Sequence, residues 1–360
     1  MLKDTTDAEV TAAAFAIHLP AISRIYSRFV AAGFGLSDQL HLVSAGEAVP
    51  FARLEELLRE APATGICKLY GRWTRALDAI IVEKAIAAAA DPLQRARLLS
   101  VRNEMGGLWL VDCRVSVANM VTAVWRVAAR MRLGLAVLDT DEVPLCGHRF
   151  ADGRGQCQHR MDALGVHPVA CAVGSGRIAR HSAIAMLVWR MCREAGFHAR
   201  REVLMPCWRR MRGGKSQQAI MDICASGHVS LRDRHIDITV RHSLCEVYAP
   251  RNARVPGAAL EVAEREKEDR YPTAVGMHCT PAALESYGRM GPAFGSLIAD
   301  LCSGASEDRV SRGLPARSPR RRWLAELSVL FAVHCAGAVI SGREPCSGTD
   351  QQSASAGASC

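Results

Sequence analysis

The spacing of hydrophobic residues changes along the chain, and this change predicts how the chain is organised. Over residues 1–140, apolar positions recur at intervals of three and four, as in TAAAFAIHLPAISRIYSRFV and RWTRALDAIIVEKAIAAAA, which is typical of amphipathic helices. Asp91 followed by Pro92 provides a helix N-cap and a first helical residue, and the pattern at 115–135 predicts one longer helix. We therefore expect residues 1–140 to form a helical region.

A mixed pattern follows residue 175. It predicts, in order, a helix at 181–196, strands near 199–205, 219–225 and 234–241, a helix at 258–271 and a strand at 273–279. Asp222 and Asp237 interrupt the second and third of these strands, which we expect to form the best-ordered hairpin. These elements predict an α+β domain over residues 176–302, in which a small mixed sheet is flanked by helices.

The remaining segments differ in composition. A Cys- and His-rich segment at 141–175 precedes the α+β domain, an arginine-rich linker at 303–322 follows it, and a tail at 343–360 has the composition of a disordered segment. The apolar segment between linker and tail, 323–342, is nearly long enough to cross a membrane, but Glu326 and His334 interrupt it. We therefore expect a helix docked on the protein and no membrane partner.

The charge of the chain favours an anionic partner. Its net charge is +9, and only five of its 45 basic residues are lysines. Such a balance favours nucleic acid first and a membrane surface second, although codon bias in a GC-rich genome would also enrich arginine. The first residues contain no secretory signal. We therefore expect a nuclear or cytoplasmic protein with reduced cysteines.

The Cys- and His-rich segment contains candidate metal ligands. They are Cys146, His148, Cys157, His159, His167 and Cys171. A structural zinc site needs four nitrogen or sulfur donors brought together by short loops. Cys146 and Cys157 flank a glycine-rich stretch that predicts a turn or hairpin, and His167 and Cys171 are separated by three residues. These four predict a zinc knuckle, and the other two histidines are then bystanders or phosphate contacts. The alternative is a loop of unligated cysteines.

Carboxylates and a lysine form a second candidate site. Metal-dependent cleavage of a phosphodiester needs carboxylates on rigid neighbouring strands to hold Mg²⁺, and a lysine that orients water or stabilises developing charge. Asp222 and Asp237 could supply the carboxylates, with Glu202 as a third, and Lys267 lies on the following helix one turn before Tyr271. The alternatives are a hairpin end or surface position for the aspartates and a solvated helix face for the lysine.

These motifs, in this order, resemble the C-terminal region of reverse-transcriptase-like proteins of non-LTR retrotransposons, especially the element-derived families of protist genomes. The similar stretches include CGHRF, MDALGVHPVAC, GRIARHSAI, REVLMP, MDICA, DITVRHSL and EREKEDRY, and the resemblance covers roughly residues 10–340. In that family a zinc knuckle precedes a restriction-like endonuclease domain of the PD-(D/E)XK type. The resemblance implies zinc at Cys146, Cys157, His167 and Cys171 and Mg²⁺ at Asp222 and Asp237.

The resemblance also implies roles for other residues. Thr239 stands where many such nucleases keep a lysine, and the related subfamily moves this lysine to the helix, which makes Lys267 the catalytic lysine and Glu202 a supporting acid. The residues assigned to nucleic-acid binding are Arg180, His181 and Tyr271. No Tyr-x-Asp-Asp polymerase signature occurs in the chain, so we expect a fragment or a decayed remnant without a polymerase domain.

Three functions fit these observations. The first is a Mg²⁺-dependent endonuclease domain, derived from a retrotransposon, that binds and nicks DNA. The second is a non-catalytic remnant that binds nucleic acid, either DNA or element RNA, and the third is an inert product of a decaying element. The geometry of the acid pair separates the first two, because a nuclease needs both carboxylates within about 4–6 Å of each other and the lysine turned toward them.

Overall fold

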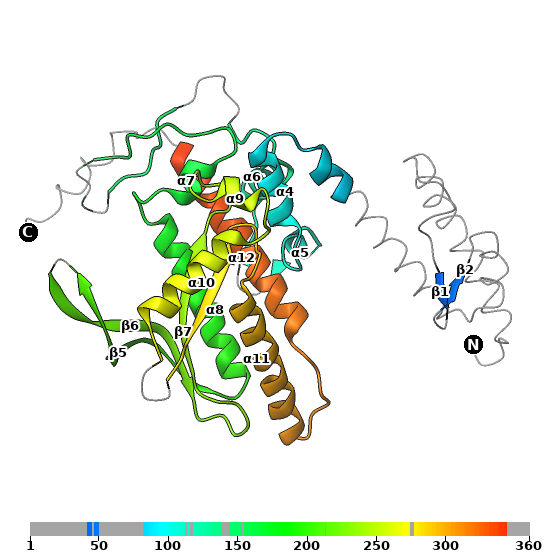
Figure 1. Ribbon diagram of the computed structural model, residues 1–360, viewed down its shortest axis with the longest axis vertical. Coiled ribbons are helices and arrows are strands. Elements are labelled where there is room, and N and C mark those ends of the chain that lie inside the picture. Colours follow the sequence, from blue (N-terminus) through cyan, green and yellow to red (C-terminus); the bar gives the residue numbers. More distant parts are fainter. Residues whose placement is uncertain are drawn as a thin grey trace, which may run out of the picture. The chain divides into compact units, whose positions relative to one another are not determined.

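The computed structural model describes residues 42–44, 47–49, 82–111, 114–115, 118–138, 144–150, 152, 155–212, 214–273 and 277–343 (Figure 1). The chain divides into two compact units, Met1–Ala88 and Ala89–Cys360. In the first unit, the described residues are the antiparallel pair β1 (Leu42–Ser44) and β2 (Glu47–Val49) and the helical residues 82–88. The other helices predicted before residue 82, and the tail after residue 343, lie outside the described residues.

The second unit is an α+β domain. Its elements are α4 (Pro92–Val101), α5 (Leu108–Val111), β3 (Arg114–Val115), β4 (Ala118–Asn119), α6 (Thr122–Leu133), α7 (Val166–Ala170), α8 (Gly176–Glu194), β5 (His198–Arg212), β6 (Lys215–Ser226), β7 (Arg234–Arg241), α9 (Ala249–Asn252), α10 (Ala258–Arg270), β8 (Cys279–Glu285), α11 (Pro292–Ser311) and α12 (Arg320–Arg343). The predicted class is confirmed: a four-stranded mixed sheet is flanked by helices.

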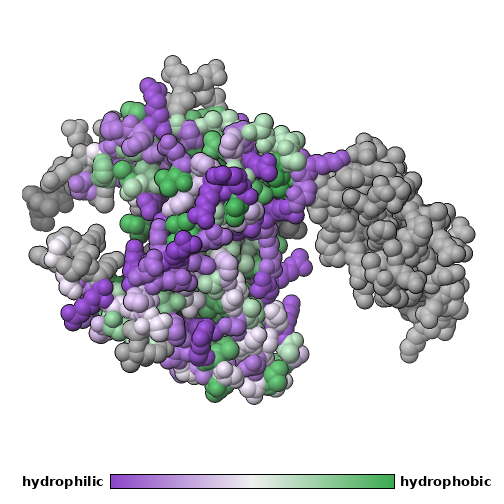
Figure 2. Space-filling model, in the orientation of Figure 1, coloured by the Kyte–Doolittle hydropathy of each residue, from purple (hydrophilic) through white to green (hydrophobic). Residues whose placement is uncertain are grey.

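The sheet has the order β5-β6-β7-β8, and only its last pair, β7 with β8, is parallel. Alternate residues of β8 face opposite sides of this sheet. Ala283 packs against α10, whereas Ala282 and Leu284 belong to the main core with α8, α11 and α12. The outer side of α10, with its run of charged residues, forms a hydrophilic band on the surface (Figure 2).

The centre of the main core is α12. Its side chains Trp323, Leu327 and Val329 are fully buried, and the helix packs on α5, α6, α7 and α8. By length and composition α12 could cross a membrane, but 67% of its apolar stretch is buried inside the unit. Its one acidic residue, Glu326, is 2% exposed and pairs with Arg190 and Arg322. The prediction of a helix docked on the protein is therefore confirmed.

Two predictions about the sheet are wrong. The last strand was predicted at 273–279, but β8 runs from Cys279 to Glu285 and contains Pro281. The strand can include this proline because β8 is an edge strand, where a residue without an N–H is tolerated. The most extensively paired hairpin is β5–β6 and not β6–β7. β5 and β6 pair along nearly their whole length, whereas β6 pairs with β7 only at residues 223–225. The pairing of β6 with β7 therefore ends immediately before Asp222 and Asp237.

Two helical boundaries also differ from prediction. The helix predicted from residue 115 begins at Thr122, because the preceding residues fold back as the β3–β4 hairpin. It ends at Gly134, whose φ of 72° favours glycine. The linker predicted from residue 303 begins later, because α11 continues to Ser311 and the first proline comes only at Pro315. In contrast, α10 and β7 lie within one residue of their predicted bounds.

A buried histidine predicts that acid destabilises this fold. His242 is 4% exposed, and neither ring nitrogen has a hydrogen-bond partner among the described residues. Burial, with a smaller contribution from the charge of Arg180, lowers the pKa of His242 to about 3, whereas the unfolded chain titrates near ~6.5. Between these values the unfolded state binds the extra proton, so stability falls as the pH falls through this window, by about 1.4 kcal/mol per pH unit below ~6.5.

Urea unfolding at pH 7.5, 6.5, 5.5 and 5.0 measures this dependence. Replacing His242 with glutamine should remove the contribution of this residue, since glutamine does not titrate. The slope of the unfolding free energy against pH should then fall by an amount that corresponds to up to one bound proton. An unchanged slope in His242→Gln would show that this histidine is not the source of the acid sensitivity.

Candidate metal centre and acidic cluster

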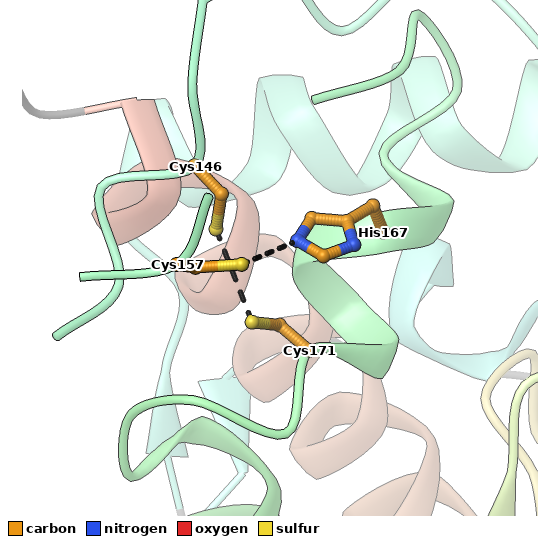
Figure 3. A group of neighbouring side chains, drawn as sticks. All are labelled: Cys146, Cys157, His167 and Cys171. Carbon is orange, nitrogen blue, oxygen red and sulfur yellow. Dashed lines mark hydrogen bonds between the residues drawn. The ribbon is translucent and has the colours of Figure 1, made fainter. Parts of the chain in front are cut away.

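Three cysteines and one histidine converge at the top of the second unit. The ligand atoms of Cys146, Cys157, His167 and Cys171 all lie within 4.8 Å of one another (Figure 3). Cys146 Sγ lies 4.0 Å from Cys171 Sγ, and Cys157 Sγ lies 3.3 Å from His167 Nε2. In a tetrahedral site with metal–sulfur bonds of about 2.3 Å, such donor atoms are roughly 3.5–3.8 Å apart. The four side chains predicted from the sequence can therefore hold a metal ion.

The local backbone explains how these donors meet. Cys146 and Cys157 are brought together by two antiparallel bridges, in which Leu145 pairs with Arg160 and Arg149 with Gln156. The other two donors lie on or immediately after the short helix α7. Asp162 holds the start of this helix, because its carboxylate accepts hydrogen bonds from three loop and helix amides, those of Leu164, Val166 and His167.

The electrostatics of the cluster favour a bound cation. Burial raises the pKa of the Cys171 thiol to about 12 and raises that of Cys146 as well, so the thiols alone would stay protonated. Burial, followed by the influence of His159, lowers the pKa of His167, which keeps the imidazole neutral and able to coordinate. A divalent metal would supply the positive charge that thiolates need here.

The two remaining histidines of the segment are not part of this cluster. His148 Nε2 lies 3.0 Å from the Ala338 carbonyl oxygen and 3.1 Å from Ser341 Oγ, and the neighbouring Gly147 amide donates to the Gly342 carbonyl. These contacts attach the Cys/His segment to the C-terminal end of α12. The ring of His159 stacks on that of His167 at 5.2 Å between centroids.

The second candidate site lies where β6 and β7 separate. Asp222 and Asp237 occupy the register position after the last paired residues, Ile223 and Ile236. Because the ladder ends there, the side chain of Asp222 takes the place of a backbone acceptor, and its Oδ2 accepts the Ile238 amide at 2.6 Å. The same oxygen lies 3.2 Å from His181 Nε2 on α8. The carboxyl groups of the two aspartates are close enough for each to influence the pKa of the other.

Lys267 completes this cluster from α10. Its ammonium group forms an ion pair with Asp237 Oδ2, and both residues are less than 10% exposed. The lysine is therefore turned toward the acid pair and not toward solvent.

The two carboxyl groups differ in their protonation behaviour. Burial disfavours the charged form of Asp222, but hydrogen bonds from His181 and the Ile238 amide outweigh burial and hold its pKa below the usual value. Burial and the nearby Asp222 raise the pKa of Asp237 against the opposing effect of Lys267. The hydrogen bond with Asp222 raises the pKa of His181. Such divergent pKa values within one group of residues are typical of functional sites.

A pocket of about 310 Å³ opens beside this acidic cluster. It lies between the first turns of α8 and the end of β7, and its lining includes His181, Arg177, Thr239 and Arg241. A helix N-terminus with neighbouring arginines attracts anions. The pocket therefore places anion-binding groups next to the paired carboxylates.

No protein-family model matches this sequence, and no curated protein is significantly similar to it. What the chain does must be inferred from its own geometry.

Three other residues singled out from the sequence are Glu202, assigned as a supporting acid, and Arg180 and Tyr271, assigned to nucleic-acid binding. Glu202 lies within β5 with a φ of 53°, and its side chain is 76% exposed and paired with Arg201. Arg180 is 4% exposed, and its Nη1 donates to the Val169 carbonyl, so it links α8 to α7 inside the core. Tyr271 is 5% exposed and packs on Trp208. Glu202 lies outside the acidic cluster, whereas Arg180 also lines the adjacent pocket. Burial, with the nearby charge of Asp237, raises the pKa of Tyr271 to about 12.

The sequence analysis missed two features of this site. His181 was assigned to nucleic acid, but its direct contact is with Asp222. Cys279 begins β8 opposite the start of β7, and burial, with the nearby charge of Asp237, raises its pKa to about 12. No local sequence signal marks either contact, because each joins elements more than forty residues apart.

Proposed function

We propose that this protein is a Mg²⁺-dependent endonuclease that binds and nicks DNA, with a structural zinc ion in its Cys/His segment. The observation that carries the proposal is the cluster of Asp222, Asp237 and Lys267 at the point where β6 and β7 separate. Two adjacent carboxylates repel each other, and they persist in a buried position best when cations compensate them. The resemblance of the sequence to retrotransposon endonuclease domains supports the same function.

The donor sets match two different metals. Three thiols and an imidazole suit zinc, which prefers sulfur and nitrogen in a closed tetrahedral site. Asp222 and Asp237 offer only oxygen donors, which suit Mg²⁺. Bound there, Mg²⁺ would polarise the phosphate and lower the pKa of an attacking water.

The side chains around the acid pair would position the substrate. A phosphate in the adjacent pocket would be attracted by Arg177 and by the amide groups at the start of α8. The ammonium group of Lys267, held by Asp237 in a buried position, would stabilise negative charge that develops on the phosphate oxygens. His181, whose pKa is raised by Asp222, would hold a proton near the same phosphate.

A second function, nucleic-acid binding without cleavage, is favoured by one observation. Lys267 is paired directly with Asp237, and His181 with Asp222, so in this arrangement both carboxylates already have partners. A protein with this arrangement would retain an anion-binding pocket and cut nothing.

A plasmid-nicking assay separates the two functions. We expect the protein to convert supercoiled DNA to the open circle when Mg²⁺ is added, and Asp237→Asn or Asp222→Asn to lower the rate on the order of a hundredfold or more. Omission of Mg²⁺ is the appropriate negative control, because a chelator would also remove zinc from the cysteine cluster.

The matched control is Glu202→Gln, which neutralises an exposed carboxylate outside the cluster and should leave nicking unchanged. If the parent binds plasmid DNA but never cuts it, the protein is a non-catalytic nucleic-acid-binding protein. Equal loss of activity in Glu202→Gln would contradict the assignment of the site.

A further inference from the structure

A second basic hollow, of about 810 Å³, lies away from the acidic cluster. Its walls come from the C-terminal end of α8, the last turns of α11, the segment 312–319 and the first turn of α12. The arginines that line it are Arg193, Arg309, Arg312, Arg317, Arg321 and Arg322. The acidic residues that line it are Glu194 and Asp308, so the hollow carries an excess of positive charge.

Part of this charge is held in place by the protein. Arg322 pairs with Glu194 at 2.5 Å, and Glu194 also accepts a hydrogen bond from the buried indole of Trp323. Arg312 pairs with Asp308 at 3.1 Å. These contacts pair two of the six arginines with the two acidic residues of the lining.

Two arginines at the rim stand apart from these pairs. Arg317 and Arg321 are exposed, and within the described part of the chain neither has an ion pair with a carboxylate. Isolated surface arginines are ordinarily solvated and need no explanation. Here they face a concave surface that already has a positive excess, which disfavours their approach to one another unless an anion lies between them.

We propose that this hollow binds the phosphodiester backbone of duplex DNA at a position separate from the acidic cluster. Guanidinium groups bind phosphate oxygens in a bidentate manner, and the hollow is too large and too charged for a single small anion. The choice of duplex DNA as the polyanion rests on the proposed function. Phosphate binding by these arginines does not depend on whether the acid pair cuts.

The two sites are connected by α8. His181 lies in the first half of this helix, and Arg193 lies twelve residues later in its last turn, which corresponds to about 18 Å along the helix axis. This spacing is equivalent to roughly five base-pair steps of a duplex. The hollow would therefore contact phosphates other than the one at the acidic cluster, and would add affinity without touching the reacting group.

The test compares two double substitutions with equal changes in net charge. Arg317→Gln with Arg321→Gln removes the rim of the hollow. Arg95→Gln with Arg254→Gln removes two exposed arginines on α4 and beyond α9, and serves as the matched control. Binding of a fluorescent 20-base-pair duplex is measured by anisotropy in buffer without Mg²⁺ at several salt concentrations, and thermal unfolding establishes that both variants are folded.

We expect the rim variant to bind the duplex on the order of tenfold or more weakly at 0.1 M salt, and the slope of log K against log salt to fall by nearly two. The control variant should change affinity by no more than about twofold. Equal losses in the two variants would overturn the proposal, because net charge alone would then explain binding. Stronger competition by an RNA of the same sequence than by the duplex would overturn the choice of DNA.

This test and the nicking assay fail independently. If the rim variant lowers the slope of log K against log salt but the parent protein never nicks DNA, the proposal of DNA binding in the hollow stands and the proposal of a nuclease fails. Nicking by a protein whose rim variant binds normally would retain the nuclease and reject the hollow.

Discussion

Replacing Cys171 with serine should release one metal ion per chain and destabilise the second unit by roughly 3 kcal/mol or more. Structural zinc contributes apparent binding free energies on the order of 10 kcal/mol in small zinc domains. Here only the segment from Pro144 to Cys171 depends on the metal directly, so the expected loss is smaller. Metal content measured by mass spectrometry and stability measured by urea unfolding together test this expectation.

Cys302→Ser is the control, because Cys302 is also buried but lies in α11, away from the metal cluster. It should retain the metal and lose only about 1 kcal/mol. A full complement of metal in Cys171→Ser would contradict the assignment of this cysteine as a ligand.

Replacing Lys267 with methionine should also cost about 3 kcal/mol, for a different reason. The substitution leaves the carboxylate of Asp237 buried without its cation, and breaking one side of a buried ion pair costs roughly 3–5 kcal/mol. The double variant Lys267→Met, Asp237→Asn replaces both charges with neutral groups, and should recover most of this stability. The single variant Asp237→Asn is measured beside them. Urea unfolding of the single and double variants forms a double-mutant cycle that measures the coupling.

The same variants distinguish a functional pair from a structural one. We expect none of them to nick DNA, so the double variant should be stable and inactive. Neutralising Arg234 and Asp300, an ion pair at the start of β7, is the control and should leave nicking unchanged. Activity in the stable double variant would mean that the buried pair only supports the fold.

Local patterns predicted the elements of this fold better than their contacts. The Cys/His spacing identified the four side chains that can hold a metal ion, because antiparallel bridges and a helical turn bring nearby residues together. The acid pair could also be predicted, since a carboxylate that interrupts an apolar strand can be recognised in the sequence. The exposed position of Glu202 depends on a backbone φ of 53° within β5, which one sequence does not reveal.

Burial was the property that the sequence concealed. Arginine and tyrosine are residue types that often contact nucleic acid, but Arg180 and Tyr271 are both buried. Tertiary packing determines which face of α8 and of α10 is covered, and charged residues occur on several sides of each helix. The same applies to the basic linker. Its arginines line a hollow only because α8, α11 and α12 surround them, and the sequence alone does not predict this arrangement.

The position of α12 has a consequence for biosynthesis. This helix fills the middle of the core, and the Cys/His segment attaches to its C-terminal end through Gly147 and His148. A ribosome delivers the sheet and α8 long before it delivers α12. The apolar surfaces that α12 covers must therefore remain open until residue 343 has been translated, and during that interval the nascent chain is exposed to aggregation and needs chaperones.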